Sequence, residues 1–333
     1  MSAKPVLVLS VAAAVLVAGG ARVATGAPGQ GRIAFARDLG GLSGDLTSLY
    51  TVRPDGTGMR RVTAPPTLQA LGGDSGPTWS PNGLRLVFER NLPYWGTDRI
   101  KLMTVSSRGG VARQFTSGPF DAMPSWSPDG RRIAFTRIVP SLVSPSAPLF
   151  TVDRSGRHAA PLVGGDVNLT AAWSPDGKTI AFSRVAAGAD EPLAEATLFL
   201  ANADGSNLRQ LGNEPVHGVS PSWSPDGKRL AFVSFADENA PPCPANSCPP
   251  NGELYVIGSD GSGLTRLTRS RADDEHPTWS PAGTRLAFAS GFSLRSQGHA
   301  PWLMTMPARG GKAVRIGRFS GVVDPAWSPA GVR

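Results

Sequence analysis

The stretch Trp173-Ser-Pro-Asp-Gly177, followed by Lys178-Thr-Ile-Ala-Phe-Ser-Arg184, decides the fold of this chain because variants of it recur along the sequence. Each of six copies opens with Trp-Ser-Pro, and successive copies are 47, 47, 50, 56 and 48 residues apart. The six tryptophans are Trp79, Trp126, Trp173, Trp223, Trp279 and Trp327. A repeat of about fifty residues with a Pro/Gly turn in every copy is typical of β-propellers.

The third copy shows the plan of one repeat. An apolar segment ends at the Ser-Pro-Asp-Gly turn, an alternating segment follows, and a second tight turn, Ala203-Asp-Gly-Ser206, comes later. The expected strands are 168–173, 178–184, 197–201 and 208–211. Four antiparallel strands of this kind form one propeller blade.

The two ends of the chain complete each other. After Trp327 only a few residues remain, and Gly31–Arg37 repeats the pattern of Gly130–Arg137 with one residue omitted. We therefore expect an all-β fold over residues 31–333, a six-bladed β-propeller of four-stranded antiparallel blades. N-terminal strands complete the last blade, and this closure removes exposed sheet edges.

The N-terminus predicts export. Lys4 precedes an apolar segment, 6–18, and small residues follow up to Ala27. This is the pattern of a signal peptide over 1–27, cleaved between about residues 20 and 27. An uncleaved membrane anchor is the alternative. In both cases we expect the propeller outside the cytoplasm: periplasmic, at the cell envelope or secreted.

The charge balance limits the class of partner. The chain has 33 basic and 25 acidic residues, which gives a net charge of +8. The basic residues are scattered and match no nucleic-acid motif, so we expect no nucleic-acid partner. We expect a monomer, with a membrane contact only through an uncleaved signal.

Loop lengths distinguish the two faces of the ring. The short Ser-Pro-Asp-Gly and Asp-Gly turns lie on one face, the short-turn face. The opposite, long-loop face carries 38–48, 91–99, 138–148, 185–196, 235–252 and 290–301. Long loops on a rigid scaffold commonly bind ligands, so this is the expected working face. Tyr94 and Trp95 could stack there on a sugar or a peptide side chain, or fold over their own blade.

Polar residues recur five positions before the tryptophans. This position holds Asp74, Asp121, Asn168, Gly218, Asp274 and Val322. Three carboxylates and one amide at the channel mouth could hold Ca²⁺, or a Lys or Arg of a partner. The alternative is that each aspartate caps its own turn. His276, two residues after Asp274, could join a His/Asp metal site or be a solvated loop histidine.

Two cysteines, Cys243 and Cys248, lie close together in a Pro-rich loop. In an exported chain they most simply form a disulfide that shapes the loop. Metal binding by this pair would require further ligands.

The repeated Trp-Ser-Pro-Asp-Gly signature resembles the TolB-type propeller, over residues 31–333, without the extra N-terminal domain of TolB. Similar repeats occur in periplasmic scaffolds, in prolyl peptidases and in carbohydrate-active enzymes. From the fold, the difference in loop length between the two faces and the lack of a catalytic constellation in the sequence, we expect a non-catalytic, exported scaffold that binds a protein, a peptide or a cell-envelope polysaccharide on its long-loop face. No cofactor is expected apart from Ca²⁺. The alternative is a lyase or hydrolase that uses Asp74, Asp121, Asp274 and His276.

Overall fold

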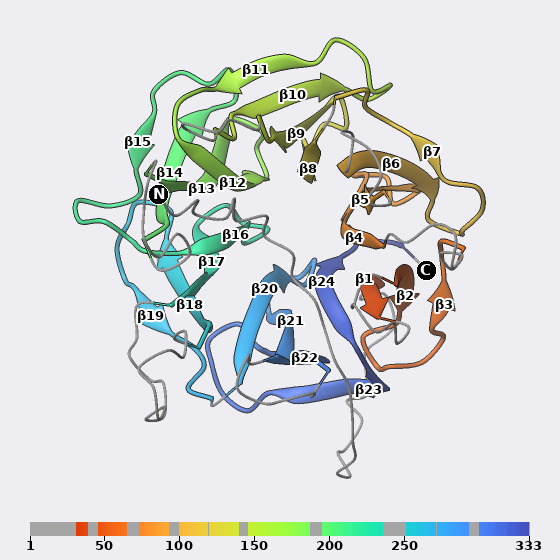
Figure 1. Cartoon of the computed structure of the whole chain (residues 1–333). Helices are drawn as coiled ribbons and strands as arrows, with labels where there is room; N and C mark the ends of the chain where they lie inside the picture. Colours follow the sequence, from red (N-terminus) through yellow and green to blue (C-terminus); the bar gives the residue numbers. More distant parts are fainter. Residues whose placement is uncertain are drawn as a thin grey trace, which may run out of the picture.

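The computed structural model shows a ring of six β-sheets around a central axis (Figure 1). It describes residues 31–38, 46–64, 73–92, 100–118, 120–139, 146–186, 195–235, 251–270, 272–292 and 300–332. These residues form 24 strands and no helix long and apolar enough to cross a membrane. The all-β, six-bladed architecture predicted from the repeat is confirmed.

Each blade has four antiparallel strands, and the first of each set lines the centre of the ring (Figure 1). Blade 1 is β4 (Asp74–Trp79), β5 (Arg85–Asn91), β6 (Ile100–Ser106) and β7 (Arg113–Gln114). Blade 2 is β8 (Asp121–Trp126), β9 (Arg132–Arg137), β10 (Leu149–Asp153) and β11 (Ala160–Val163). Blade 3 is β12 (Val167–Trp173), β13 (Thr179–Val185), β14 (Thr197–Asn202) and β15 (Arg209–Gln210).

The other three blades follow the same order. Blade 4 is β16 (Val219–Trp223), β17 (Arg229–Ser234), β18 (Glu253–Gly258) and β19 (Thr265–Arg266). Blade 5 is β20 (Asp273–Trp279), β21 (Arg285–Phe292), β22 (Trp302–Pro307) and β23 (Val314–Ser320). Blade 6 joins β24 (Val322–Trp327) to β1 (Ile33–Asp38), β2 (Thr47–Val52) and β3 (Arg60–Arg61).

The ring closes within blade 6. Strand β24 pairs antiparallel with β1, with Ile33 opposite Trp327. Beyond the strands, the Arg32 amide donates a hydrogen bond of 2.8 Å to the Ser328 hydroxyl. The two ends of the described chain therefore hold each other, as the sequence predicted.

One aromatic residue anchors the middle of each blade. The second strand of every blade carries a phenylalanine that is almost completely buried: Phe35, Phe88, Phe135, Phe182, Phe232 and Phe288. The repeated tryptophans link neighbouring blades, because the Trp79 indole N–H donates to the Ala326 carbonyl at 3.0 Å and the Trp173 N–H to the Ser125 carbonyl at 3.2 Å. Bonds of this kind are worth about 1 kcal/mol each.

The Ser-Pro-Asp-Gly turns are structural. In blade 3 the Ser174 hydroxyl donates to Asp176 Oδ1 at 2.6 Å, and the Thr179 amide donates to Ser174 Oγ at 2.9 Å. Gly177 adopts a φ of 69°, which glycine accepts without steric cost.

Several sequence predictions concern residues outside the described ranges. These are the signal peptide over 1–27, the aromatic pair Tyr94 and Trp95, and the disulfide between Cys243 and Cys248.

Candidate functional site

Every innermost strand is interrupted by a β-bulge on the channel side of its blade. The pairing with the second strand shifts register there, for example between Ser75 and Thr78 in blade 1. The residue at the bulge has a positive φ between 41° and 55° in all six blades. These residues form what we call the bulge ring: Gly76, Met123, Thr170, Ser220, His276 and Asp324. Because only one of the six is glycine, the ring stores backbone strain of the kind that gathers at functional sites.

Side chains of the bulge ring connect one blade to the next around the channel. Asp324 Oδ2 accepts a hydrogen bond of 3.0 Å from the Gly76 amide. Thr170 Oγ1 accepts one of 3.2 Å from the Ser220 amide. Met123 Sδ accepts a hydrogen bond of 3.2 Å from the Thr170 amide. These bonds connect blade 6 to blade 1, blade 2 to blade 3 and blade 3 to blade 4, so polar contacts of the bulge ring cross three of the blade boundaries.

In blade 1 the contact to the next blade comes from a residue of the second strand. Gly76 has no side chain, and Glu89 of β5 reaches across instead, so that its Oε1 accepts a bond of 2.7 Å from the Met123 amide. A Cβ added to Gly76 would lie 2.8 Å from that oxygen. The glycine at 76 and the glutamate at 89 are thus two parts of one arrangement.

Titratable groups are concentrated in one part of the wall. His276 Nε2 lies 3.1 Å from Asp324 Oδ1, and His276 Nδ1 lies 3.9 Å from Glu275 Oε2. Glu89 lies within electrostatic reach of both Asp324 and His276. We call Glu89, Glu275, His276 and Asp324 the acidic arc; it spans blades 5, 6 and 1. Blades 2, 3 and 4 present the neutral Met123, Thr170 and Ser220.

The acidic arc has more negative charge than its surroundings stabilise. Burial raises the pKa of Glu89 to about 7, and the nearby Asp324 adds to this, against the opposing effects of the Met123 N–H and His276. Burial also raises the pKa of Glu275. Carboxylates with raised pKa values bind a proton more readily than solvated ones.

Three of the residues predicted to ring the channel mouth are buried and paired within their own blades. Asp74, Asp121 and Asn168 are 3%, 0% and 0% exposed. Each binds an arginine sixteen positions later on the second strand of its own blade. Arg90 bonds Asp74 at 2.6 and 2.9 Å, Arg137 bonds Asp121 at 2.7 and 3.0 Å, and Arg184 bonds Asn168 at 2.9 Å. Neither sequence alternative, a cation ring or a turn cap, included these pairs.

Asp274 differs from Asp74, Asp121 and Asn168 because blade 5 has Ser290 where blades 1, 2 and 3 have arginine. The carboxylate is 2% exposed, and Oδ2 is 3.3 Å from the Ser270 hydroxyl. Burial raises the pKa of Asp274 to about 6; hydrogen bonds from Ser290 and Thr268 oppose this, and the charge of Glu253 adds to it. Asp274 is therefore a buried acid that has no arginine partner among the residues that the structure describes.

His276 belongs to the bulge ring, and the carboxylates of Asp74 and Asp121 bind Arg90 and Arg137. Within the described residues no group of three or more His, Cys, Asp or Glu side chains has an arrangement that could hold a metal ion.

Glu89, Glu275 and Asp324 were not among the site residues predicted from the sequence. One signal for Glu89 exists: it stands where the other second strands have small or β-branched residues, namely Ala36, Thr136, Ser183, Val233 and Ala289. The spacing of sixteen between Asp and Arg could likewise have revealed the buried pairs.

Fold and channel together define a six-bladed β-propeller with a polar, partly acidic central channel. No family profile matches the chain. A TolB homolog from Chlorobium luteolum is 40% identical over 79 residues, which are 24% of this chain and 17% of that protein. The match thus spans less than a fifth of the length of that relative.

Solved structures extend the likeness to the whole ring. TolB from Acinetobacter baumannii has a TM-score of 0.66 at 20% identity, covering 90% of this chain and 67% of that one. A putative TolB from Agrobacterium tumefaciens gives 0.63 at 18%, covering 91% and 94%. An oligogalacturonate lyase in complex with manganese gives 0.55 at 17%, covering 87% and 74%. The chain is a TolB-like six-bladed β-propeller.

Proposed function

We propose that this protein is an exported, non-catalytic scaffold that binds a protein or peptide on its long-loop face, with the acidic arc receiving a Lys or Arg side chain. The observation that carries the proposal is the acidic arc itself. Three carboxylates and one histidine from three blades meet in the channel wall.

The position of the acidic arc supports this face. The bulge residues lie near the start of the innermost strands, and these strands begin at the long-loop face. A cationic side chain entering from that face would meet Asp324 and Glu275 beside His276. It would replace the proton that Glu89 otherwise retains and would relieve the repulsion between Glu89 and Asp324.

A peptide-display library tests the proposal. Random peptides selected on the full chain should be enriched in Lys and Arg, and Asp324→Asn with Glu275→Gln should weaken the selected peptides at least tenfold. Asp260→Asn, at an exposed position in the turn between β18 and β19 on the short-turn face, is the matched control and should leave affinity unchanged. Selected peptides that lack Lys and Arg, or that bind the channel variant equally well, would refute the proposal.

A second candidate is a carbohydrate-active lyase or hydrolase. The observation in its favour is chemical: the pair of His276 and Asp324 adjoins Glu89, whose pKa of about 7 suits a general acid or base. One structural neighbour is an oligogalacturonate lyase in complex with manganese.

Turnover decides between the two candidates. Polygalacturonate, with and without Mn²⁺, should give no increase in ultraviolet absorbance from unsaturated products if the protein only binds. An increase in absorbance that is lost in His276→Gln, and kept in Glu214→Gln, would establish that the protein is a lyase.

A further inference from the structure

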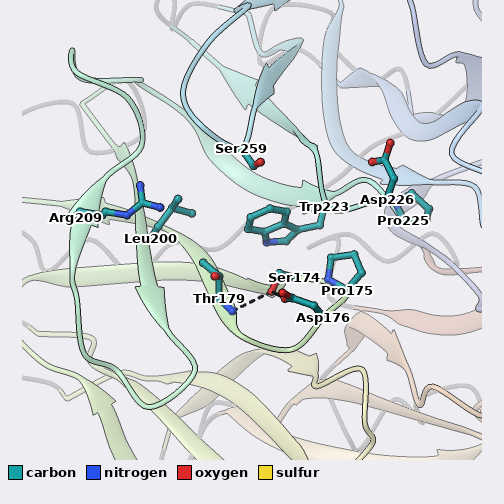
Figure 2. Close-up of a pocket in the computed structure, with 11 residues that line it drawn as sticks. Ser174, Pro175, Asp176, Thr179, Leu200, Arg209, Trp223, Pro225, Asp226 and Ser259 are labelled. Atoms are coloured by element: carbon teal, nitrogen blue, oxygen red, sulfur yellow. Dashed lines mark hydrogen bonds between the residues drawn. The ribbon is translucent and has the colours of Figure 1, made fainter.

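A cleft of about 510 Å³ opens on the short-turn face between blades 3 and 4 (Figure 2). It lies away from the acidic arc and is independent of the function proposed for the channel. The indole of Trp223 lies at its centre. The lining residues include Thr179 and Leu200 of blade 3 and Ser259 of blade 4.

The cleft results from one departure from the repeat. At the start of the second strand, five blades carry an arginine, and blade 3 carries Thr179. The five arginines are Arg32, Arg85, Arg132, Arg229 and Arg285.

In the neighbouring blades such an arginine covers the next tryptophan. The guanidinium of Arg132 lies 5.0 Å from the ring centre of Trp173, and that of Arg229 lies 4.8 Å from Trp279. The covered indoles of Trp173 and Trp279 are only 7% and 5% exposed, whereas Trp223 is half-buried, as is Trp126, on which Arg85 does not stack. The equivalent cleft that contains Arg132 measures about 280 Å³.

The hydrogen bond that Arg132 makes beside Trp173 has a counterpart position in the cleft. Arg132 Nη1 donates to the Ala203 carbonyl at 3.2 Å. Ser259 holds the same position in blade 4 and lines the cleft. The cleft therefore repeats the surroundings of a stacked guanidinium while Thr179 leaves the indole face uncovered.

The charge of the cleft is also suited to a cation. Asp176 and Asp226 line it. Hydrogen bonds from Ser174 and Ser224, together with turn amides, lower the pKa values of these two carboxyls. Both are thus ionised at neutral pH. Arg209 lies at the far end, beyond Leu200 and away from Asp226 (Figure 2).

We propose that this cleft binds an arginine side chain of a protein or peptide partner, which stacks on Trp223 as Arg132 stacks on Trp173. A guanidinium fits better than a lysine ammonium because it is planar and can stack and donate at the same time. Among the described residues, no arginine or lysine of this chain stacks on Trp223.

Titration of the full chain with N-acetyl-arginine amide tests the proposal. The Trp223 indole N–H resonance, assigned by its loss in Trp223→Phe, should shift and saturate. N-acetyl-citrulline amide, which has a similar shape without the charge, should bind at least fivefold more weakly. Thr179→Arg should reduce binding at least tenfold, because the introduced side chain takes the place of the ligand.

A gain of binding provides the complementary test. Arg132→Ala should uncover Trp173 and add a second, similar site, seen as a shift of the Trp173 indole resonance. This readout does not depend on how Thr179→Arg folds. Equal binding of citrulline, tighter binding of digalacturonate, or arginine binding unchanged in Thr179→Arg would each overturn the proposal.

Discussion

Replacing Glu89 by glutamine should make the protein more stable at alkaline pH and leave its stability at acid pH almost unchanged. Glutamine keeps an oxygen that can accept the bond from the Met123 amide, now 2.7 Å long, but it removes the ionisable group. The variant therefore isolates the free energy that is lost when Glu89 ionises within the channel wall.

The sign follows from the raised pKa of Glu89, about 7 against an ordinary value of 4.5. Below pH 4.5 both the folded and the unfolded chain hold the proton. Between pH 4.5 and 7 only the folded chain holds it, so the stability of the wild-type protein falls as pH rises. At 1.36 kcal/mol per pKa unit, the full loss is about 3 kcal/mol. Between pH 5 and pH 8 it amounts to about 2 to 3 kcal/mol.

Urea unfolding followed by tryptophan fluorescence at pH 5 and pH 8 measures this difference. The free energy of unfolding of Glu89→Gln relative to that of the wild type should be about 2 to 3 kcal/mol higher at pH 8 than at pH 5. Glu214→Gln, at an exposed site, should show no such gain. A difference in the free energy of unfolding between Glu89→Gln and the wild type that does not change with pH would refute the reasoning.

Three further substitutions test other parts of the wall. Gly76→Ala should destabilise the fold by about 1 to 2 kcal/mol, because its φ is 55° and the new Cβ would lie 2.8 Å from Glu89 Oε1; part of this loss should return in Gly76→Ala with Glu89→Ala, measured by urea unfolding. Asp121→Ala should cost about 2 to 3 kcal/mol because it leaves Arg137 unpaired, and Asp121→Asn should cost about 1 kcal/mol or less because Asn168 already serves Arg184 in this way; equal costs would contradict this interpretation. Ser290→Arg should give Asp274 the missing partner and add about 1 to 2 kcal/mol at pH 7 but little at pH 4, since the pKa of Asp274 is about 6.

The repeat made the architecture predictable. Trp-Ser-Pro at six places gives the number of blades, and the strands of blade 3 lie within about a residue of their expected bounds at most ends. Ring closure was also readable, because the missing strand pattern reappears at Gly31–Arg37. These features depend on local turns and on alternating apolar residues, which leave a periodic trace in the sequence.

The channel wall was much less predictable. The bulge ring contains chemically unrelated residues, so no pattern marks the position, and His276 alone was singled out. The acidic arc joins Glu89 to Asp324, which are distant in sequence and meet only because the ring closes. The side chain of Glu89 can occupy its position only because Gly76, on the neighbouring strand, has no side chain. The sequence of one strand alone does not reveal this dependence.

The most direct test of the central claim is a thermal-shift titration of the full chain with trilysine. The net charge of +8 opposes unspecific binding of a cationic peptide, so a shift reports a local acidic site. The account predicts a rise in melting temperature for the wild type that disappears in Asp324→Asn with Glu275→Gln. No rise in the wild type, or an equal rise in both proteins, would contradict it.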